Sequence, residues 1–283
     1  MKIGFIGAGR VGTTIAKYLK EHGKSVTGFY SRSKEHAMES ASFTDTLCFT
    51  DTKTLVEESD VVFLTVSDGA IESVFRELLS TCDLTEKIIC HTSGSMASTV
   101  FAGASQKVYG YSVHPNFAVS DKLTTYQTFH NAFITIEGSP EHLNDVKEIF
   151  TSSGLSVATI SPNVKAKYHA ASVYASNLIC GVFGASIRLL TECGFSEEDA
   201  EKALHGLFLA NAEGIAANGP VAQLTGPVER SDISTVRRHL NVLSEDDAKT
   251  YRRLQLEVVR LAQKKHLDRD YTELVNLLEG DRT

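Results

Sequence analysis

A glycine-rich turn near the start of the chain constrains the fold more than any other feature of the sequence. Residues 3–12 read Ile-Gly-Phe-Ile-Gly-Ala-Gly-Arg-Val-Gly, so Gly7-x-Gly9-x-x-Gly12 follows an apolar strand pattern and opens a helical one. In such a turn the first glycine permits a sharp bend, the second lets a pyrophosphate approach, and the third lets helix and strand pack closely. Free amides at the helix N-terminus also favour phosphate groups. The pattern predicts a βαβ unit that binds a dinucleotide.

The residues after the second predicted strand indicate which dinucleotide is bound. An NAD site holds the ribose 2′-hydroxyl with an Asp or Glu about 20 residues beyond the glycines. This chain has Ser31-Arg32-Ser33 at that place, and its next acidic residue is Glu35. A guanidinium between two hydroxyl groups suits a 2′-phosphate. We therefore predict NADP(H) as the cofactor, with NAD(H) as the alternative.

Strand and helix patterns alternate through the first half of the chain, which is typical of a parallel sheet with helices on both faces. The expected strands are 2–6, 25–30, 46–49, 61–66, 87–91, 108–113 and 132–137. From Pro162 to Gly194 no strong breaker appears, which predicts one helix of about 30 residues. Further helices are expected at 197–216, 231–241, 245–265 and 270–279. We predict an α/β Rossmann domain with a doubly wound parallel sheet over residues 1–160, joined to an all-α domain over residues 161–283.

Further cofactor contacts are expected at the carboxyl ends of the strands, where the ligands of such sheets bind. The expected contacts are Arg10 and Val11 in the glycine turn, Val66, Ser67 and Asp68 after the strand at 61–66, and Ser93 after the strand at 87–91. Asp68 has an alternative role, because a carboxylate there can cap the helix that follows.

The overall composition argues against several classes of function. The net charge is −7 and the basic residues are scattered, which disfavours a nucleic-acid partner. The histidines and cysteines form no HxxxH, HExxH or CxxC pair, so no protein-bound metal is expected. The longest small-or-apolar run, 178–187, is shorter than the ~20 residues of a membrane span. The first strand begins at Lys2 and leaves no room for a signal peptide, so we expect a cytoplasmic protein without membrane contact.

The best candidates for catalysis lie on the first long helix. Reduction of a carbonyl by a nicotinamide needs a proton donor for the oxygen, usually a Lys, His or Tyr. Lys165 and His169 are four residues apart and share one helix face. Ser172, Ser176 and Asn177 extend that polar stripe through otherwise apolar sequence. We predict Lys165 as the donor, oriented by His169 and Asn177; alternatively, Lys165 is a solvated first-turn lysine and His169 a satisfied core histidine.

Two further segments bring polar groups to the same sheet edge. His114 follows the strand at 108–113, and we expect Pro115 to force the chain out of the sheet. The segment His91-Thr92-Ser93-Gly94-Ser95 follows the preceding strand. We predict that His114 and Ser93 contact the substrate, although Ser93-Gly94 also suits an ordinary turn.

The assembled motifs resemble those of the 6-phosphogluconate dehydrogenase-like superfamily, which couples an N-terminal Rossmann domain to a helical C-terminal domain. More narrowly, the chain is similar to Rossmann-like oxidoreductases with a C-terminal helical domain of unknown function, some of which are an alternative type of ketopantoate reductase. The motifs are His91-Thr92-Ser93-Gly94, Ser112-Val113-His114-Pro115, Tyr168-His169-Ala170-Ala171 with Ser176-Asn177, and residues 224–232 (LTGPVERSD) with Thr235 and His239. They span nearly the whole chain.

The resemblance implies a catalytic lysine near the start of the interdomain helix, with an asparagine one turn later. Lys165 matches the lysine, but the residue one turn later is His169. The role of His169 relative to Lys165 therefore stays open, and Lys167 is an alternative donor. The resemblance also implies a homodimer formed through the helical domain.

The same resemblance favours a small 2-oxo acid as substrate, with 2-dehydropantoate as the first candidate. Arg230 and His239 would then bind its carboxylate if their loop folds back over the sheet edge; alternatively, Arg230 only pairs with Asp232. A protein of a different class remains possible, namely a non-catalytic NADP(H)-binding sensor or scaffold, because a fold does not fix a function. The polar stripe on an apolar helix favours the enzyme.

Overall fold

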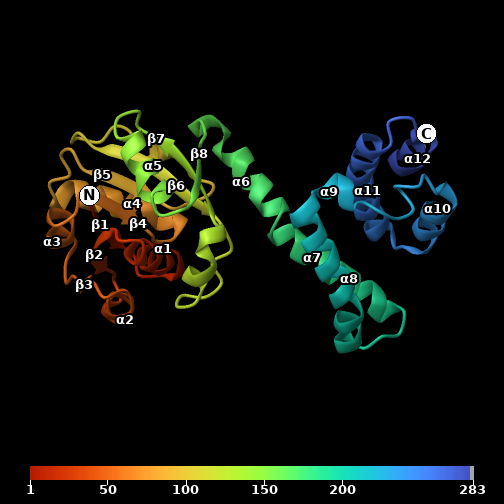
Figure 1. Cartoon of the computed structure of the whole chain (residues 1–283), viewed down its shortest axis with the longest axis horizontal. Coiled ribbons are helices and arrows are strands. Elements are labelled where there is room, and N and C mark those ends of the chain that lie inside the picture. The colour runs from red at the N-terminus through yellow and green to blue at the C-terminus, as the bar shows by residue number, and fades with distance from the viewer. Residues whose placement is uncertain (281–283) are drawn as a thin grey trace. The chain divides into compact units, whose positions relative to one another are not determined.

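The chain forms two compact units, Met1–Cys180 and Gly181–Thr283, in a computed structural model that describes residues 1–280. The first unit is built on an eight-stranded sheet of order β3-β2-β1-β4-β5-β6-β7-β8 (Figure 1). Its strands are β1 (Lys2–Ile6), β2 (Ser25–Tyr30), β3 (Leu47–Cys48), β4 (Val61–Leu64), β5 (Ile88–His91), β6 (Tyr109–Asn116), β7 (Phe133–Gly138) and β8 (Ser156–Thr159). The predicted Rossmann-type sheet is confirmed.

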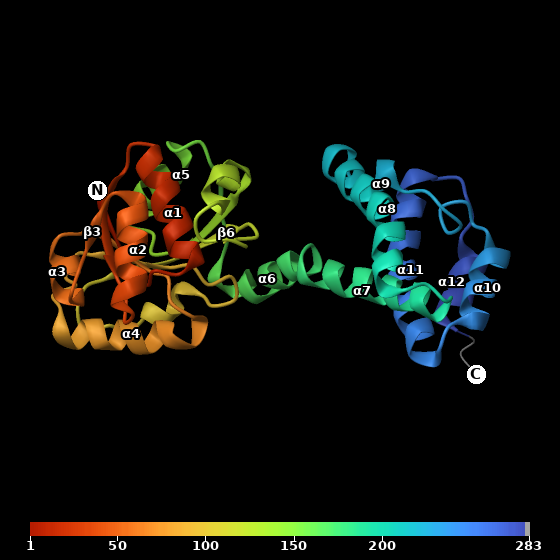
Figure 2. The same ribbon diagram turned by 90° about the horizontal axis from the view of Figure 1, so that it is seen from below.

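Helices cover both faces of this sheet (Figure 2). One face packs against α1 (Arg10–Glu21), α2 (Lys34–Thr44) and α5 (Leu143–Thr151). The other packs against α3 (Thr52–Glu57), α4 (Asp68–Thr81) and the short 3-10 helix η1 (Ser98–Phe101). β4 is buried on both faces, as its continuous apolar sequence predicts.

The sheet departs from the prediction at β6, β7 and β8. β6 is antiparallel to β7, whereas the other neighbouring strands run parallel. The expectation that Pro115 leaves the sheet is wrong, because Pro115 pairs with Ile134 inside β6. β5 pairs with β6 only as far as Ser112, so Pro115 has a partner strand on one side, and an edge of this kind tolerates a proline.

The expected helix of about 30 residues is interrupted. It starts as a 3-10 turn, η3 (Pro162–Val164), continues as α6 (Lys165–Tyr174), and resumes as α7 (Asn177–Glu192). At the break, the hydroxyl of Ser176 donates to the carbonyl of Ser172 at 2.7 Å. A serine that bonds back by one turn competes with the helical ladder and bends the helix. Pro162–Glu192 as a whole is long and apolar enough to cross a membrane, which is weak evidence by itself.

The second unit is helical throughout its regular structure. Its further helices are α8 (Glu197–Asn218), α9 (Pro220–Gln223), α10 (Ile233–Val242), α11 (Glu245–Lys265) and α12 (Thr272–Glu279). Val236, Val259 and Leu274 form the centre of a core between α10, α11 and α12. The units divide at Cys180 rather than at the expected residue 160, and the start of α6 contacts the sheet, for example through Tyr168 and His114.

Candidate functional site

The three glycines of the turn after β1 differ in what surrounds them. Gly7 has φ +110°, and a Cβ there would lie 2.5 Å from the carbonyl oxygen of Thr65. A Cβ on Gly12 would lie 2.3 Å from Thr65 Oγ1, so this glycine is needed for close packing. A Cβ on Gly9 would meet nothing within 4 Å. Open space beside a helix N-terminus fits the approach of a pyrophosphate.

The glycine turn and the residues after β2 line one cavity of about 500 Å³. Of the residues predicted to bind the cofactor, its lining includes Gly7, Gly9, Ser31, Arg32, Val66 and Ser67. This is the arrangement that a dinucleotide with a 2′-phosphate requires, since a guanidinium and a hydroxyl share the cavity with the phosphate-binding turn.

Three other predicted cofactor residues have structural partners next to this cavity. Arg10 donates to the carbonyl of Ser120 in the loop after β6, at 3.0 Å. Val11 packs against the apolar core beneath α1. Ser33 is the N-cap of α2 and accepts from the amide of His36.

Asp68 and Ser93 form a hydrogen-bonded pair between α4 and the loop after β5. The hydroxyl of Ser93 donates to the Asp68 carboxylate at 2.6 Å, and that of Ser95 does so at 3.2 Å. Ser67, not Asp68, is the N-cap of α4, so the alternative role of Asp68 as a cap is wrong. Asp68 instead fixes the position of the loop, which brings Ser93 and Gly94 close to β6.

A row of polar side chains crosses three strands on one face of the sheet. His91 on β5 pairs with Ser112 on β6, which pairs with Glu137 on β7. His114, two residues after Ser112 on β6, pairs with Thr135 on β7. Because alternate residues of a strand point to the same face, the side chains of these two pairs and of His91 all project from one face. It is the face that carries α4 and η1, and its polar part begins where their apolar core ends.

Glu137 is the most buried charge of this row, at 2% exposure. Its carboxylate accepts from the amide of Ser98 at 2.7 Å and from the hydroxyl of Ser98 at 2.6 Å. His91 is also fully buried, and burial lowers the pKa of its imidazole to about 4. Its Nδ1 accepts from the amide of Ser93, whereas its Nε2 has no hydrogen-bond partner among residues 1–280.

Lys165, the first residue of α6, covers this polar face. Its side chain is 1% exposed, and its Nζ has no hydrogen-bond partner in the described part of the chain. The ammonium lies 5.4 Å from the centre of the Tyr168 ring. Burial lowers the pKa of Lys165 to about 8, although the nearby carboxylates of Glu137 and Asp68 partly oppose this effect. The alternative of a solvated first-turn lysine is therefore wrong.

His114 and His169 meet beside Gly94. Their ring centres are 6.0 Å apart, and a Cβ on Gly94 would lie 2.4 Å from His169 Cδ2 and 2.7 Å from His114 Nε2. The other ring nitrogen of His114, Nδ1, is 2.8 Å from the hydroxyl of Tyr168. The pKa of His114 is lowered to about 4, mainly by burial and to a smaller extent by the neighbouring Lys165 and His169. His114 is thus a neutral imidazole at neutral pH.

A second cavity of about 610 Å³ adjoins the two histidines. It is lined by His114, by the following residues up to Ser120, and by α6 and the start of α7, including His169, Ser172 and Asn177. Lys165 does not line it. The lining residues include no Asp, Glu, Lys or Arg, so the cavity offers hydrogen-bonding groups and apolar surface but no fixed charge.

The remaining predicted substrate residues belong to the second unit. Arg230 is exposed, and its guanidinium forms no hydrogen bond or ion pair within residues 1–280. The suggested pairing with Asp232 is wrong, because that carboxylate caps α10 through the amide and hydroxyl of Thr235. His239 Nδ1 is 2.8 Å from the hydroxyl of Tyr251.

Glu137, Tyr168 and Gly94 were not among the site residues predicted from the sequence. Glu137 carried a usable signal, since a charged residue in a predicted interior strand is rare unless it has a partner. Tyr168 and Gly94 were recorded as parts of motifs, but their contacts with His114 depend on how α6 and the Ser93 loop approach β6.

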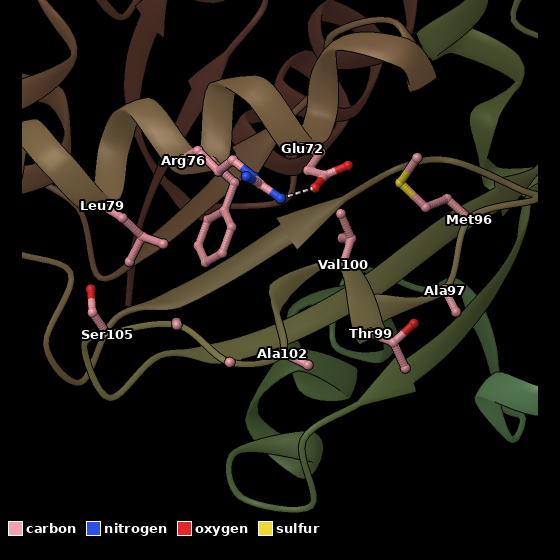
Figure 3. A pocket seen from close by; sticks show the side chains of 12 residues that line it. Glu72, Arg76, Leu79, Met96, Ala97, Thr99, Val100, Ala102 and Ser105 are labelled. Atoms are coloured by element: carbon pink, nitrogen blue, oxygen red, sulfur yellow. Dashed lines mark hydrogen bonds and ion pairs between the residues drawn. The ribbon is translucent and has the colours of Figure 1, made fainter.

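A third cavity, of about 590 Å³, lies between α4 and residues 96–105 (Figure 3). Its charged lining residues, Glu72 and Arg76, pair with each other at 2.5 Å. The remaining lining is mostly apolar or small. Apart from this ion pair, its polar side chains are the hydroxyl groups of Thr99 and Ser105, so the lining within residues 1–280 contains no unpaired titratable side chain.

Two family models match different parts of the chain. Residues 2–107 match the family described as NADP oxidoreductase coenzyme F420-dependent, and residues 132–258 match a domain of unknown function, DUF2520. The chain joins an NADP oxidoreductase-like Rossmann domain to a DUF2520 domain. The first match confirms NADP(H) as the predicted cofactor. The second begins just before β7, so it includes both Glu137 and Lys165.

Several solved structures share this fold. Protein TM1727 from Thermotoga maritima is 25% identical, with a TM-score of 0.70 over 95% of this chain and 100% of that one. A pyrroline-5-carboxylate reductase from Coxiella burnetii is 16% identical, with a TM-score of 0.62 over 94% and 97%. The pyrroline carboxylate reductase of Plasmodium falciparum, solved with NADP bound, is 15% identical, with a TM-score of 0.60 over 94% and 96%.

A search of curated proteins finds no significant match. At such identities the two reductases show the fold alone. The match of residues 2–107 indicates an NADP-dependent oxidoreductase, and the fold of the two reductases is consistent with that activity. The substrate is not identified by these matches.

Proposed function

We propose that the chain reduces the carbonyl group of a small molecule with NADPH, and that Lys165 donates the proton to the carbonyl oxygen, which becomes the hydroxyl group of the product. The observation that carries this proposal is the buried Lys165 ammonium without a hydrogen-bond partner. Burying a cation without a partner is costly, so we expect the ligand to supply the acceptor. Its pKa of about 8 suits a general acid near neutral pH.

The first cavity provides for the cofactor. Gly9 leaves room for the pyrophosphate at the N-terminus of α1, and Ser31 and Arg32 supply a hydroxyl and a guanidinium for the 2′-phosphate. When bound, NADPH supplies the hydride. The chain's own groups orient the substrate and provide the proton.

We propose a small 2-oxo acid as the substrate class, with 2-dehydropantoate as the first compound to test, bound in the second cavity. Its histidine, serine and asparagine side chains suit carbonyl and hydroxyl groups. The buried Lys165 ammonium lies outside this lining, so the proposal requires the substrate oxygen to reach it on binding. Because the lining itself is uncharged, each 2-oxo acid should be compared with its neutral amide. A preference for the amide would contradict the acid as the substrate.

Replacing Lys165 tests the proposal most directly. We expect Lys165→Met to lower kcat by about 10²–10⁴-fold, the usual contribution of a general acid. Lys167→Met is the matched comparison, since Lys167 is exposed on the same helix, and its kcat should stay within about twofold of wild type. A larger loss in Lys167→Met than in Lys165→Met would assign the proton to Lys167.

The pH dependence gives a second readout of the same group. A general acid must be protonated, so kcat/KM of the wild type, which reports the free enzyme, should fall as pH rises through about 8, the pKa of Lys165. NADPH binding without turnover across a panel of carbonyl compounds, with intact protein, would favour a non-catalytic sensor instead.

A further inference from the structure

The contact between Tyr168 and His114 joins α6 to β6 over the polar face of the sheet. Tyr168 Oη and His114 Nδ1 are 2.8 Å apart, and the two rings are T-shaped with centres 5.6 Å apart. Burial raises the pKa of Tyr168 and lowers that of His114, so both side chains are neutral at neutral pH. A neutral imidazole carries its hydrogen on one nitrogen only. The contact with Tyr168 therefore determines which nitrogen of His114 is the donor.

The chemistry of the two side chains decides the direction of this hydrogen bond. A phenol O–H is more acidic than the N–H of a neutral imidazole, and an imidazole nitrogen is a better acceptor than a phenol oxygen. The Tyr168 hydroxyl therefore donates to His114 Nδ1 across the 2.8 Å contact. Nδ1 then accepts, and Nε2 carries the hydrogen.

The Nε2 of His114 faces the loop at Gly94. A Cβ on Gly94 would lie 2.7 Å from this nitrogen, so the backbone of the loop and the imidazole are in close contact. Both His114 and His169 line the uncharged cavity. Because Nδ1 is occupied by Tyr168, Nε2 is the His114 nitrogen left to donate a hydrogen to a molecule in this cavity.

We propose that Tyr168 holds His114 in the Nε2–H tautomer, and that this N–H donates a hydrogen bond to the carbonyl oxygen of the substrate. Tyr168 is then a positioning residue, which acts through His114, and His114 loses no proton in the reaction. The part about substrate rests on the proposed function. The part about the tautomer concerns the free protein and can be tested without a substrate.

The test is a long-range ¹H–¹⁵N correlation spectrum of the uniformly labelled full chain, with His114 assigned by the signals that His114→Gln removes. In the wild type at pH 7 we expect one His114 tautomer, protonated on Nε2. Tyr168→Phe should give a mixture of both tautomers and lower kcat/KM for an accepted carbonyl substrate by about tenfold, the factor that one hydrogen bond supplies. Tyr174→Phe, an exposed tyrosine on the same helix, should change neither readout.

An Nδ1–H tautomer in the wild type would overturn the proposal even if Tyr168→Phe failed to fold. An Nε2–H tautomer with no compound turned over would leave Tyr168 assigned and refute the reductase instead.

Discussion

At the scale of single residues, Gly9 and Gly12 belong to one motif but have different roles: Gly9 leaves space for the cofactor, and Gly12 allows close packing against Thr65. Gly9→Ala places a methyl group in open space, so we expect unchanged thermal stability and a loss of NADPH affinity of tenfold or more, on the order of one lost charged contact. Gly12→Ala places the methyl against Thr65 and should destabilise the fold by about 1–3 kcal/mol. Calorimetry and fluorescence titration of both variants measure the difference; equal destabilisation would contradict it.

Arg32 is predicted to discriminate between the two nicotinamide cofactors. Arg32→Ala removes the guanidinium beside the cavity of the glycine turn, so NADPH affinity should fall about 10–100-fold, the value of a hydrogen bond to a charged group. The affinity for NADH, which lacks the 2′-phosphate, should change little. A similar loss for both cofactors would show that Arg32 acts on the fold or on another part of the dinucleotide.

Some site residues could be predicted from the sequence, whereas their burial and their distant contacts could not. Lys165 and His114 could be predicted because helical spacing and strand ends place polar groups in known directions. The burial of Lys165 could not, because it depends on how α6 approaches the sheet. Tyr168 was hidden for the same reason, since its partner His114 lies 54 residues away.

At the scale of secondary-structure elements, Glu137 ties β7 to η1 through Ser98. The carboxylate is buried and receives both hydrogen bonds from that one residue. Ser98→Ala removes the hydroxyl donor and should cost about 1–3 kcal/mol, the penalty for leaving a buried acceptor less satisfied. Urea unfolding measures this, with Thr99→Ala on the exposed side of η1 as control. Equal effects of the two substitutions would rule out the link.

The buried histidines of β5 and β6 predict how stability depends on pH. His91 and His114 have pKa values near 4 in the folded protein, below the value of about 6.5 in an unfolded chain. Between these values the unfolded chain binds more protons, so stability should fall as pH drops from about 6.5 to 4. Melting temperatures at pH 7 and pH 5 measure the loss, and His91→Asn should reduce it. A melting temperature independent of pH in this window would show that both imidazoles charge freely in the fold.

Most helices and strands could be predicted from the spacing of apolar residues and from the Gly, Pro and capping residues that end each element. The elements that could not be predicted have local causes. β8 was missed because its four residues are half-buried or exposed and lack the apolar run of an interior strand. The break between α6 and α7 was missed because Ala175 and Ser176 are ordinary helix residues by composition. The hydroxyl of Ser176 bonds back to Ser172 at the break, but Ser186 makes the same bond inside α7, so such a bond does not predict where a helix breaks.

At the scale of the whole molecule, α7 and α8 carry exposed apolar side chains that are typical of a protein–protein interface. Leu178, Ile179 and Val182 on α7 are exposed, as are Leu207, Phe208 and Leu209 on α8. Large apolar surfaces of this kind mark interaction sites. We propose that two copies of the chain associate through these helices as a homodimer.

Leu207→Glu should shift the molar mass from dimer to monomer in light scattering without detergent, because it places a charge in the proposed interface. Val242→Glu is the matched control, since Val242 is as exposed but lies at the end of α10. A monomeric wild type would contradict the dimer. Binding of the wild type to lipid vesicles would point to the long helix Pro162–Glu192 as a membrane contact instead.

The antiparallel pairing of β7 with β6 affects which part of this fold can vary in sequence without disturbing the sheet. Because β7 runs back along β6, the segment between Asn116 and Phe133 needs no crossover, and it stays at the edge where β6 ends. It supplies lining residues such as Phe117 to the uncharged cavity, and Ser120 to the bond with Arg10. Natural variation in the length or composition of this one surface loop can therefore change ligand preference while the sheet is left intact.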